Sequence, residues 1–190
     1  MSFRIFIPVV LILALASAEA LKAQSSGKIR SRKIKQVTII TTEKDKKGRE
    51  TEVKMVRAYD KKGNLTSEAV YAANGDLKRR KVYEYNRFGK QTARYEYDSK
   101  NLLRKQKLTE YHNYFRKPVK EVYWENGEIA RTKTTSYDVN GKRIRQTTRN
   151  AKGDVTRERK YFYDNKGMLS RREDTLKSGS TKVIAWQYEN

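Results

Sequence analysis

A tyrosine that recurs every 26 residues is the feature that most constrains this chain. The clearest copies read Tyr-Asp-x-x-Gly-x-Leu, as at positions 59–65 and 163–169. Self-similarity at a fixed period of this length is typical of repeat architectures, in which each unit packs on its neighbours. The sequence therefore predicts repeated copies of one supersecondary unit. The repeated tyrosines are Tyr59, Tyr85, Tyr111, Tyr137 and Tyr163.

Each 26-residue unit contains two turn signals, which from Gly63 onward alternate at intervals of 12 and 14 residues. The order Asp-Lys-Lys-Gly at 60–63 suits a type I turn followed by a left-handed residue. Asn-Gly pairs, as at 126–127, favour tight hairpins. The expected turn glycines, or the residues that take their place, are Gly48, Gly63, Gly75, Gly89, Asn101, Phe115, Gly127, Gly141, Gly153, Gly167 and Gly179.

The segments between these turns are rich in strand-forming residues and show no apolar helical period. Turns at this spacing leave strands of about 7–10 residues, and tight turns require successive strands to run antiparallel. We therefore expect an all-β fold over residues 34–190. Its form is an antiparallel β-meander of about twelve strands, built from 26-residue two-strand repeats.

Neither face of the predicted strands is a clean apolar layer. In 77–85 and in 154–163, alternate positions carry one aliphatic residue, then two basic residues, then tyrosines. Only 36% of the chain is hydrophobic, and the N-terminus holds a large share of that. Cross-strand pairs contribute about 0.2–1 kcal/mol each, and basic side chains can lay their stems over rings. We expect a single-layer or weakly curled sheet, in which tyrosine ladders replace a core.

Residues 1–23 predict an export signal: a basic start at Arg4, an apolar run over 5–16, and small residues that offer cleavage points. The apolar run is shorter than the roughly 20 residues of a membrane span, although an uncleaved anchor is the alternative. We expect a flexible leader over 24–33, no transmembrane segment after cleavage, and a location in the periplasm, on the cell surface or outside the cell. The cleavage candidates are Ala18, Ala20 and Ala23.

The phrase Tyr-Asp-x-x-Gly-x-Leu, with a second Gly about 12 residues on, resembles the YD repeats of RHS-type proteins. The match is closest at 59–85 and extends over 57–189. The resemblance implies an exported antiparallel β-repeat that forms toxin shells or serves in surface contact and carbohydrate binding. The ending at 21–24 also resembles exported proteins of the Bacteroidetes.

The chain departs from the RHS pattern in several places. Asn86 and His112 replace the motif Asp, and Phe115 replaces the turn Gly. The units are too few to enclose a payload, and no toxin region follows them. We therefore expect no toxin-delivery role, and the family motif supplies no catalytic residue.

The residue patterns that enzymes use are missing from the sequence. Its single histidine, His112, falls in a turn, without a positioned partner. There is no Cys, no phosphate-binding glycine loop and no nucleophile elbow. The aspartates of the repeats are expected to cap turns, because calcium loops need several oxygens close in sequence. We expect no enzyme activity, no catalytic residue, no cofactor and no metal. Those aspartates are Asp60, Asp98, Asp138 and Asp164.

The formal charge of +22, from 44 Lys and Arg against 22 Asp and Glu, attracts polyanions. Basic residues that alternate with Tyr provide donors for sulfate, phosphate or carboxylate and rings for stacking. The alternative is a solvated strand face whose lysines discourage edge-to-edge pairing. The candidate polyanion-binding residues are Arg79, Lys81, Tyr83, Tyr85, Arg94, Tyr97, Arg157, Arg159 and Tyr161.

Two hypotheses for function follow. The first is a non-enzymatic surface interaction module that binds acidic glycan, such as an anionic polysaccharide, or another cell-surface polyanion. The second is a structural, envelope-associated protein that its charge tethers to an anionic surface, with no dedicated ligand. No module for sequence-specific nucleic acid recognition is present in the sequence, and the oligomeric state is left open.

Overall fold

The computed structural model describes residues 26–44, 48 and 50–188. The export signal expected for 1–23 lies outside the described residues. The chain divides into two compact units. The first ends at Gly89 but also includes Glu96–Leu102, and the second comprises Lys90–Tyr95 and the residues from Leu103 onward. Strand β5 (Gln91–Tyr97) therefore contributes to both units.

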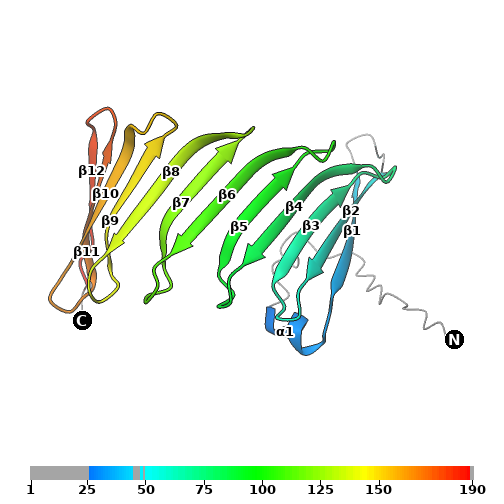
Figure 1. The fold of residues 1–190 in the computed structure, drawn as a ribbon, viewed down its shortest axis with the longest axis horizontal. Coiled ribbons are helices and arrows are strands. Elements are labelled where there is room, and N and C mark those ends of the chain that lie inside the picture. Colours follow the sequence, from blue (N-terminus) through cyan, green and yellow to red (C-terminus); the bar gives the residue numbers. More distant parts are fainter. Residues whose placement is uncertain (1–25, 45–47, 49, 189–190) are drawn as a thin grey trace. The chain divides into compact units, whose positions relative to one another are not determined.

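Twelve strands form one sheet in which the order of the strands is their order in the sequence (Figure 1). The predicted antiparallel meander is confirmed. One short helix lies in the segment 24–33 that was expected to be a flexible leader, and no helix in the described ranges is long and apolar enough to cross a membrane. The elements are α1 (Ser26–Ser31), β1 (Gln36–Lys44), β2 (Glu50–Tyr59), β3 (Leu65–Tyr71), β4 (Leu77–Tyr85), β5 (Gln91–Tyr97), β6 (Leu103–Tyr111), β7 (Pro118–Glu125), β8 (Glu128–Tyr137), β9 (Arg143–Asn150), β10 (Val155–Tyr163), β11 (Leu169–Leu176) and β12 (Thr181–Ala185).

The turns that follow the repeated tyrosines, here called YD turns, are built by their aspartates. In the YD turn at 60–64, Oδ1 of Asp60 accepts hydrogen bonds from the backbone N–H groups of Lys62 and Asn64, at 2.8 and 2.9 Å. Gly63 has a φ of 81°, which a residue without Cβ adopts at little cost. Asp138 makes the same pair of bonds in its own YD turn. Capping therefore accounts for these aspartates, as the sequence predicted.

The YD turn at 112–117 corrects one prediction. The residue in the left-handed conformation is Arg116, with a φ of 55°, and not Phe115. The His112 N–H donates to the carbonyl of Lys117, five residues on, whereas the Asp60 N–H donates to the carbonyl of Asn64, four residues on. The turn at 112–117 is therefore one residue longer. Nδ1 of His112 accepts the N–H groups of two residues within the turn, so this histidine acts as the missing Asp would. The longer turn places the Phe115 ring against Gly141, where an added Cβ would meet it at 2.8 Å.

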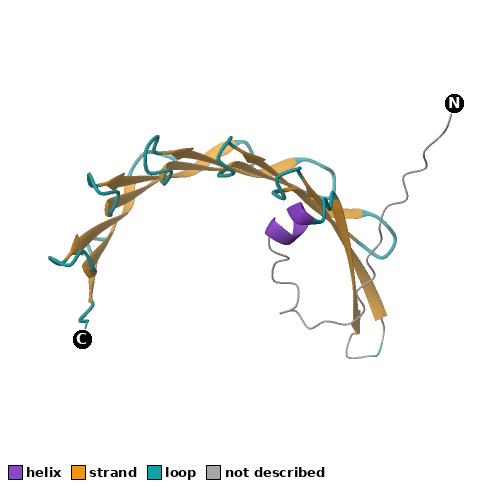
Figure 2. Ribbon diagram, turned by 90° about the horizontal axis from the view of Figure 1, so that it is seen from below, coloured by secondary structure: helices purple, strands orange, loops and turns teal. Residues whose placement is uncertain are grey.

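The interior of the sheet is small and largely polar. In the first unit Ile29 of α1, Ala69 and Val70 are buried, and in the second Ala93 is the buried aliphatic residue among those described. Figure 2 shows strands joined by loops, with α1 beside the strands of the first unit. The described residues of each unit form a single sheet and not two sheets packed on an apolar layer. Buried polar side chains must therefore form hydrogen bonds and ion pairs with one another. The buried polar residues are Thr109, Glu121, Thr135, Gln146, Thr147 and Asp174.

The repeated tyrosines connect consecutive repeats through their hydroxyl groups. Tyr137 donates to the carbonyl oxygen of Pro118 at 2.8 Å, and Tyr163 donates to that of Arg143 at 2.9 Å. Pro118 is the register partner of Tyr111 at a β-bulge, so each hydroxyl reaches the bulge of the repeat before its own. Burial raises the pKa of every tyrosine in the series above its ordinary value.

We expect Tyr137→Phe to lower the free energy of unfolding by about 1 kcal/mol, because it removes one donor from a half-buried carbonyl. Tyr114→Phe is the matched control, since Tyr114 is 83% exposed in a YD turn. Urea denaturation of both variants would measure the difference. Equal stability of the two variants would contradict the role of the hydroxyl.

Gly141→Ala and Gly153→Ala separate backbone strain from packing. Both glycines have positive φ values, 75° and 85°, but no atom lies within 4 Å of a Cβ added at Gly153. We expect Gly153→Ala to cost about 1–2 kcal/mol from the left-handed backbone alone. Gly141→Ala should cost more, because the Phe115 ring must also move. Thermal unfolding of the pair tests this order, and a larger loss for Gly153→Ala would overturn it.

Candidate functional site

In the first unit, three of the candidate polyanion-binding residues, Lys81, Tyr85 and Tyr97, are engaged with partners in the chain. The ammonium group of Lys81 lies 3.9 Å from a carboxylate oxygen of Glu68. The hydroxyl of Tyr85 donates to the carbonyl of Leu65 at 2.8 Å. The guanidinium of Arg80 lies over the ring of Tyr97, 4.6 Å from its centroid. Of the remaining candidates in this unit, Tyr83 is half-buried and Arg79 is exposed.

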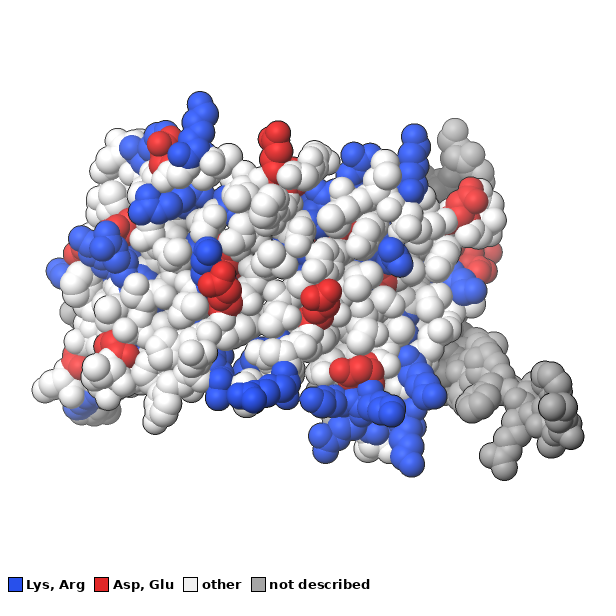
Figure 3. Space-filling view, in the orientation of Figure 1, with Lys and Arg blue, Asp and Glu red and all other residues white. Residues whose placement is uncertain are grey.

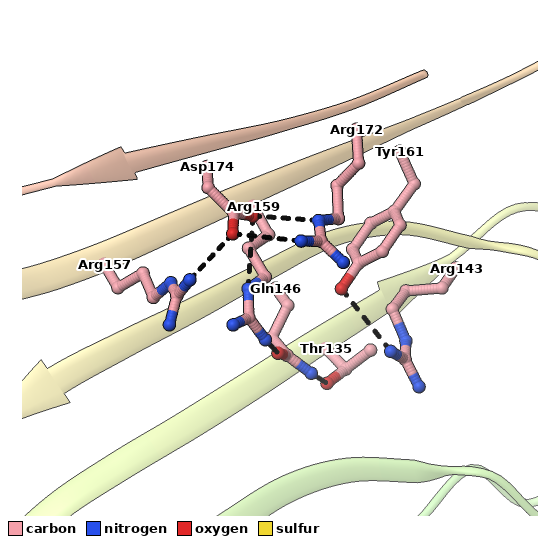
Figure 4. Close-up of polar contacts among 8 residues, drawn as sticks. All are labelled: Thr135, Arg143, Gln146, Arg157, Arg159, Tyr161, Arg172 and Asp174. Atoms are coloured by element: carbon pink, nitrogen blue, oxygen red, sulfur yellow. Dashed lines mark hydrogen bonds and ion pairs between the residues drawn. The ribbon is translucent and has the colours of Figure 1, made fainter. Parts of the chain in front are cut away.

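In the second unit, the structure brings three of the candidates together. Arg157, Arg159 and Tyr161 are alternate residues of β10, so they project from the same face of the sheet. The fourth candidate, Arg94, lies on β5 and is half-buried. The cluster around β10 is the candidate site that we describe in detail, and Figure 4 shows its eight residues.

A row of paired residues across four strands places the centre of this cluster. Arg159 is the register partner of Gln146 on β9 and of Asp174 on β11, and Gln146 is the partner of Thr135 on β8. Register partners in an antiparallel sheet share a face. Polar contacts follow the row: the Gln146 amide donates to the Thr135 hydroxyl at 3.3 Å, and Arg159 donates to Gln146 Oε1 at 3.2 Å.

Asp174 continues this row on β11, where its register partner on β12 is Lys182, and it gathers three arginines. Its side chain is only 4% exposed. Arg157 donates to Oδ2 at 2.7 Å, and the Nε atoms of Arg159 and Arg172 each lie 3.2 Å from Oδ1. Burial opposes ionisation of this carboxyl, but the hydrogen bond from Arg157 and the three positive charges outweigh it. The pKa of Asp174 is therefore held below its ordinary value.

The ion pairs around Asp174 leave both donors and an acceptor without hydrogen bonds. The Nε–H groups of Arg157, Arg159 and Arg172 are buried and make no hydrogen bond within the protein. Oδ1 of Asp174 is likewise buried without a hydrogen bond, although the Nε atoms of Arg159 and Arg172 lie 3.2 Å from it. A fourth arginine, Arg143, donates to the hydroxyl of Tyr161 at 3.4 Å. Four arginines and one aspartate carry a net charge of +3. The cluster therefore offers excess positive charge to an oxyanion.

A second buried carboxylate in this unit shows a similar arrangement. Glu121 on β7 pairs with Lys107 and with Lys133. Burial lowers the pKa of Lys133, and the nearby charges of Lys107, Arg143 and Arg159 lower it further. The positive charges around Lys133 thus repel one another even with Glu121 present. In the first unit, Glu68 accepts from Nε of Arg57 at 2.8 Å and faces Lys81 on its other side.

The sequence reasoning found cations of these clusters but missed the acids. A spacing signal was present: Lys81, Lys107, Lys133 and Arg159 are each 26 residues apart, and Glu68, Glu121 and Asp174 are each 53 apart. The residues of the β10 cluster that were not predicted are Thr135, Arg143, Gln146, Arg172 and Asp174. Among the described residues, no group of three or more His, Asp or Glu side chains gathers as a metal site would require.

No protein-family model and no curated protein matches the chain. Among solved structures, it is similar to a chain in the crystal structure of TcdB2–TccC3–Cdc42, with 16% identity over 78% of this chain and a TM-score of 0.46. It is also similar to a porin-like protein from Bacteroides uniformis, with 16% identity over 78% of this chain and a TM-score of 0.40. The chain spans 10% of the first of these chains and 57% of the second. Likenesses of this strength identify neither the family nor the function.

We expect Asp174→Asn to destabilise the protein by about 1–3 kcal/mol at neutral pH. Removal of one partner of a fully buried ion pair costs about 3–5 kcal/mol, but these arginines keep 27–41% of their side-chain surface exposed, which weakens the effect. Because the folded-state pKa lies below the ordinary value of 3.8, the stabilisation is complete above about pH 5. It is lost as the pH falls through the folded-state pKa.

The measurement is urea denaturation of Asp174→Asn and of the unmodified protein from pH 7 down to pH 3. Other carboxylates titrate in both proteins, so the difference between them isolates Asp174. The stability gap should narrow below about pH 4. A gap that widens on acidification would contradict the assignment of a lowered pKa.

Proposed function

We propose that this chain is an exported, non-enzymatic β-repeat module that binds an acidic polysaccharide or a similar polyanion through basic clusters on its strands. The observation that carries the proposal is the arginine cluster around Asp174, in which three guanidinium groups share one carboxylate. The oxygens of a sulfate or carboxylate group accept hydrogen bonds, and guanidinium binds them in a planar, bidentate manner.

The exposure of the cluster supports binding from solvent. Asp174 is buried beneath its arginines, but the Arg157 side chain keeps 41% of its surface exposed and Arg143 is also exposed. An anion would therefore meet guanidinium groups before it meets the buried carboxylate. Because the cluster lies on a strand face, an extended polymer would have access to successive strands without entering a closed pocket.

The charge distribution favours a polymer over a single small anion. On the face drawn in Figure 3, Lys and Arg side chains outnumber Asp and Glu, and many of them project where strands meet turns. Several weak ionic contacts on one chain of ligand add together, because each later contact forms at a high effective concentration. Single exposed ionic contacts contribute little in water. This proposal therefore depends on several clusters acting on one polymer.

The second hypothesis, a structural protein tethered only by its charge, predicts different behaviour. Under that hypothesis, any two substitutions that remove the same charge weaken attachment equally, wherever they lie. Under the proposed function, the position of the charge matters, because Arg157, Arg159 and Arg172 lie together around one carboxylate.

We expect the double substitution Arg157→Gln with Arg159→Gln to weaken binding to heparin, a sulfated polysaccharide, by about tenfold at moderate salt, as the loss of two charge-assisted contacts implies. The matched control is Lys152→Gln with Lys166→Gln, which removes the same charge from two exposed turn lysines. Isothermal titration calorimetry over a range of NaCl concentrations measures both affinities, and circular dichroism confirms the fold. Equal losses in the two double variants would favour the tether.

A substitution that should increase the affinity for heparin provides a second test. Asp174→Asn removes the carboxylate that competes for the arginines, so binding of heparin should tighten by about threefold or more, as expected when a competing ion-paired acceptor is removed. Asp154→Asn adds the same charge at a side chain that is 48% exposed and pairs with Lys177. Its effect on affinity should be smaller. Identical changes for the two variants would overturn the assignment of the site.

A further inference from the structure

Within the described sheet, the first strand has a neighbour on one side only. The strand order begins with β1, which pairs with β2. The N–H of Tyr59 donates to the carbonyl of Lys35, and in the β1–β2 register this makes the odd-numbered residues of β1 the hydrogen-bonded partners of β2. The backbone N–H and C=O groups of the even-numbered residues therefore point away from β2. Over 36–42 these residues are Gln36, Thr38, Ile40 and Thr42.

The sequence of β1 is exceptional among the strands of this highly charged chain. Residues 36–42 read Gln-Val-Thr-Ile-Ile-Thr-Thr and carry no charge, whereas uncharged runs in the other strands have at most four residues. All but the first of these seven residues are β-branched, which favours an extended backbone. The stretch contains neither Pro nor Gly, and the side chain of Ile40 is 45% exposed. Such an edge is a ready template for another strand.

The last strand of the sheet is protected in the ways that β1 is not. Strand β12 has only five residues, and Lys182 places a charge near its start. Its neighbour β11 adds Arg171 and Arg172, which face β12 as register partners of its last residues. Short length and positive charge both discourage pairing at an edge. The two edges therefore differ, and β1 is the one open to a partner.

A second copy of β1 fits this edge in register and in hydrogen bonding. In an antiparallel pair centred on Ile39, Gln36 lies opposite Thr42 of the second copy, and Thr38 lies opposite Ile40. Even-numbered residues then meet even-numbered residues, so the outward backbone groups of each strand bond to those of the other. Because the uncharged stretch 36–42 is itself centred on Ile39, it pairs entirely with its own copy, and no like charges meet within it.

The charge of the surrounding segment also favours a second copy. Residues 36–52 contain four acidic and four basic residues, so this segment has no formal net charge in a chain of +22. Repulsion between copies is therefore weaker here than along the basic strands. We infer that β1 is the interface of a homodimer, formed by antiparallel pairing of β1 with β1 about a two-fold axis. Such an interface closes on itself, because each copy uses the same strand.

Cross-linking tests the predicted register, because the chain contains no cysteine. In the dimer, residue 39 faces its own copy in a non-hydrogen-bonded pair, where Cα atoms lie about 4.5 Å apart and a disulfide can form. Two copies of residue 40 lie diagonally, about 7–8 Å apart, which is too far. We expect Ile39→Cys to form the disulfide-linked dimer on mild oxidation at least about tenfold faster than Ile40→Cys. Equal rates, or no cross-link in either variant, would overturn this pairing.

Sedimentation equilibrium at moderate NaCl, which screens the net charge, tests the interface without cross-linking. We expect the unmodified protein to pass from monomer to dimer as its concentration rises. Ile40→Lys should weaken this association by at least about tenfold, because it places two lysines diagonally across the pair. Val183→Lys is the matched control on β12, where Val183 is 56% exposed, and it should leave the dimer unchanged. A monomer at every concentration, assemblies larger than a dimer, or equal weakening by Val183→Lys would each contradict the β1 interface.

Discussion

The hydrogen bond from Tyr85, Tyr111, Tyr137 and Tyr163 to a carbonyl of the preceding repeat is the interaction on which this sheet depends. A single-layer sheet has no second layer to cover its side chains, so its stability must come from contacts between neighbouring strands. The tyrosine hydroxyl reaches over the YD turn before its own and bonds at the bulge that this turn creates. The same Tyr-Asp-Gly phrase thus makes the turn, makes the bulge and supplies the donor that connects one repeat to the next.

Buried carboxylates provide the second element of cohesion, and they account for the low apolar content of the chain. Glu68 in the first unit, and Glu121 and Asp174 in the second, are nearly covered by the arginines and lysines of adjacent strands. A buried acid without partners would be costly, but several cations on neighbouring strands offset that cost. Their 53-residue spacing places one acid in every second repeat, so the cations of the intervening repeats remain in excess. The charge of +22 is therefore part of how the sheet is assembled.

Turn chemistry made the strand order predictable, whereas the polar clusters depend on register. Glycine and Asp positions were enough to place nearly all the turns and hence the meander. The left-handed residue of the turn at 112–117 was predicted wrongly, because the extra residue of this turn moves the left-handed position to Arg116, which no residue preference signals. The role of Asp174 was not predicted from the sequence for a related reason. It faces Arg159 only because bulges shift the pairing near the ends of β10, and a shift of one residue exchanges the faces of a strand. Sequence alone does not report such shifts.

Under the proposed function, the arginines that stabilise the sheet are also those that bind the ligand, and this overlap constrains how the cluster can act. Arg157, Arg159 and Arg172 hold the sheet together through Asp174, so a ligand that competes for them must leave part of that contact intact. The buried Nε–H groups remain close to Asp174, whereas exposed surface of Arg157 and Arg143 faces solvent. A polyanion can therefore add to the charge balance from outside while the aspartate keeps its position. If such a ligand binds the folded state more tightly than the unfolded chain, occupancy of the cluster raises the stability of the sheet.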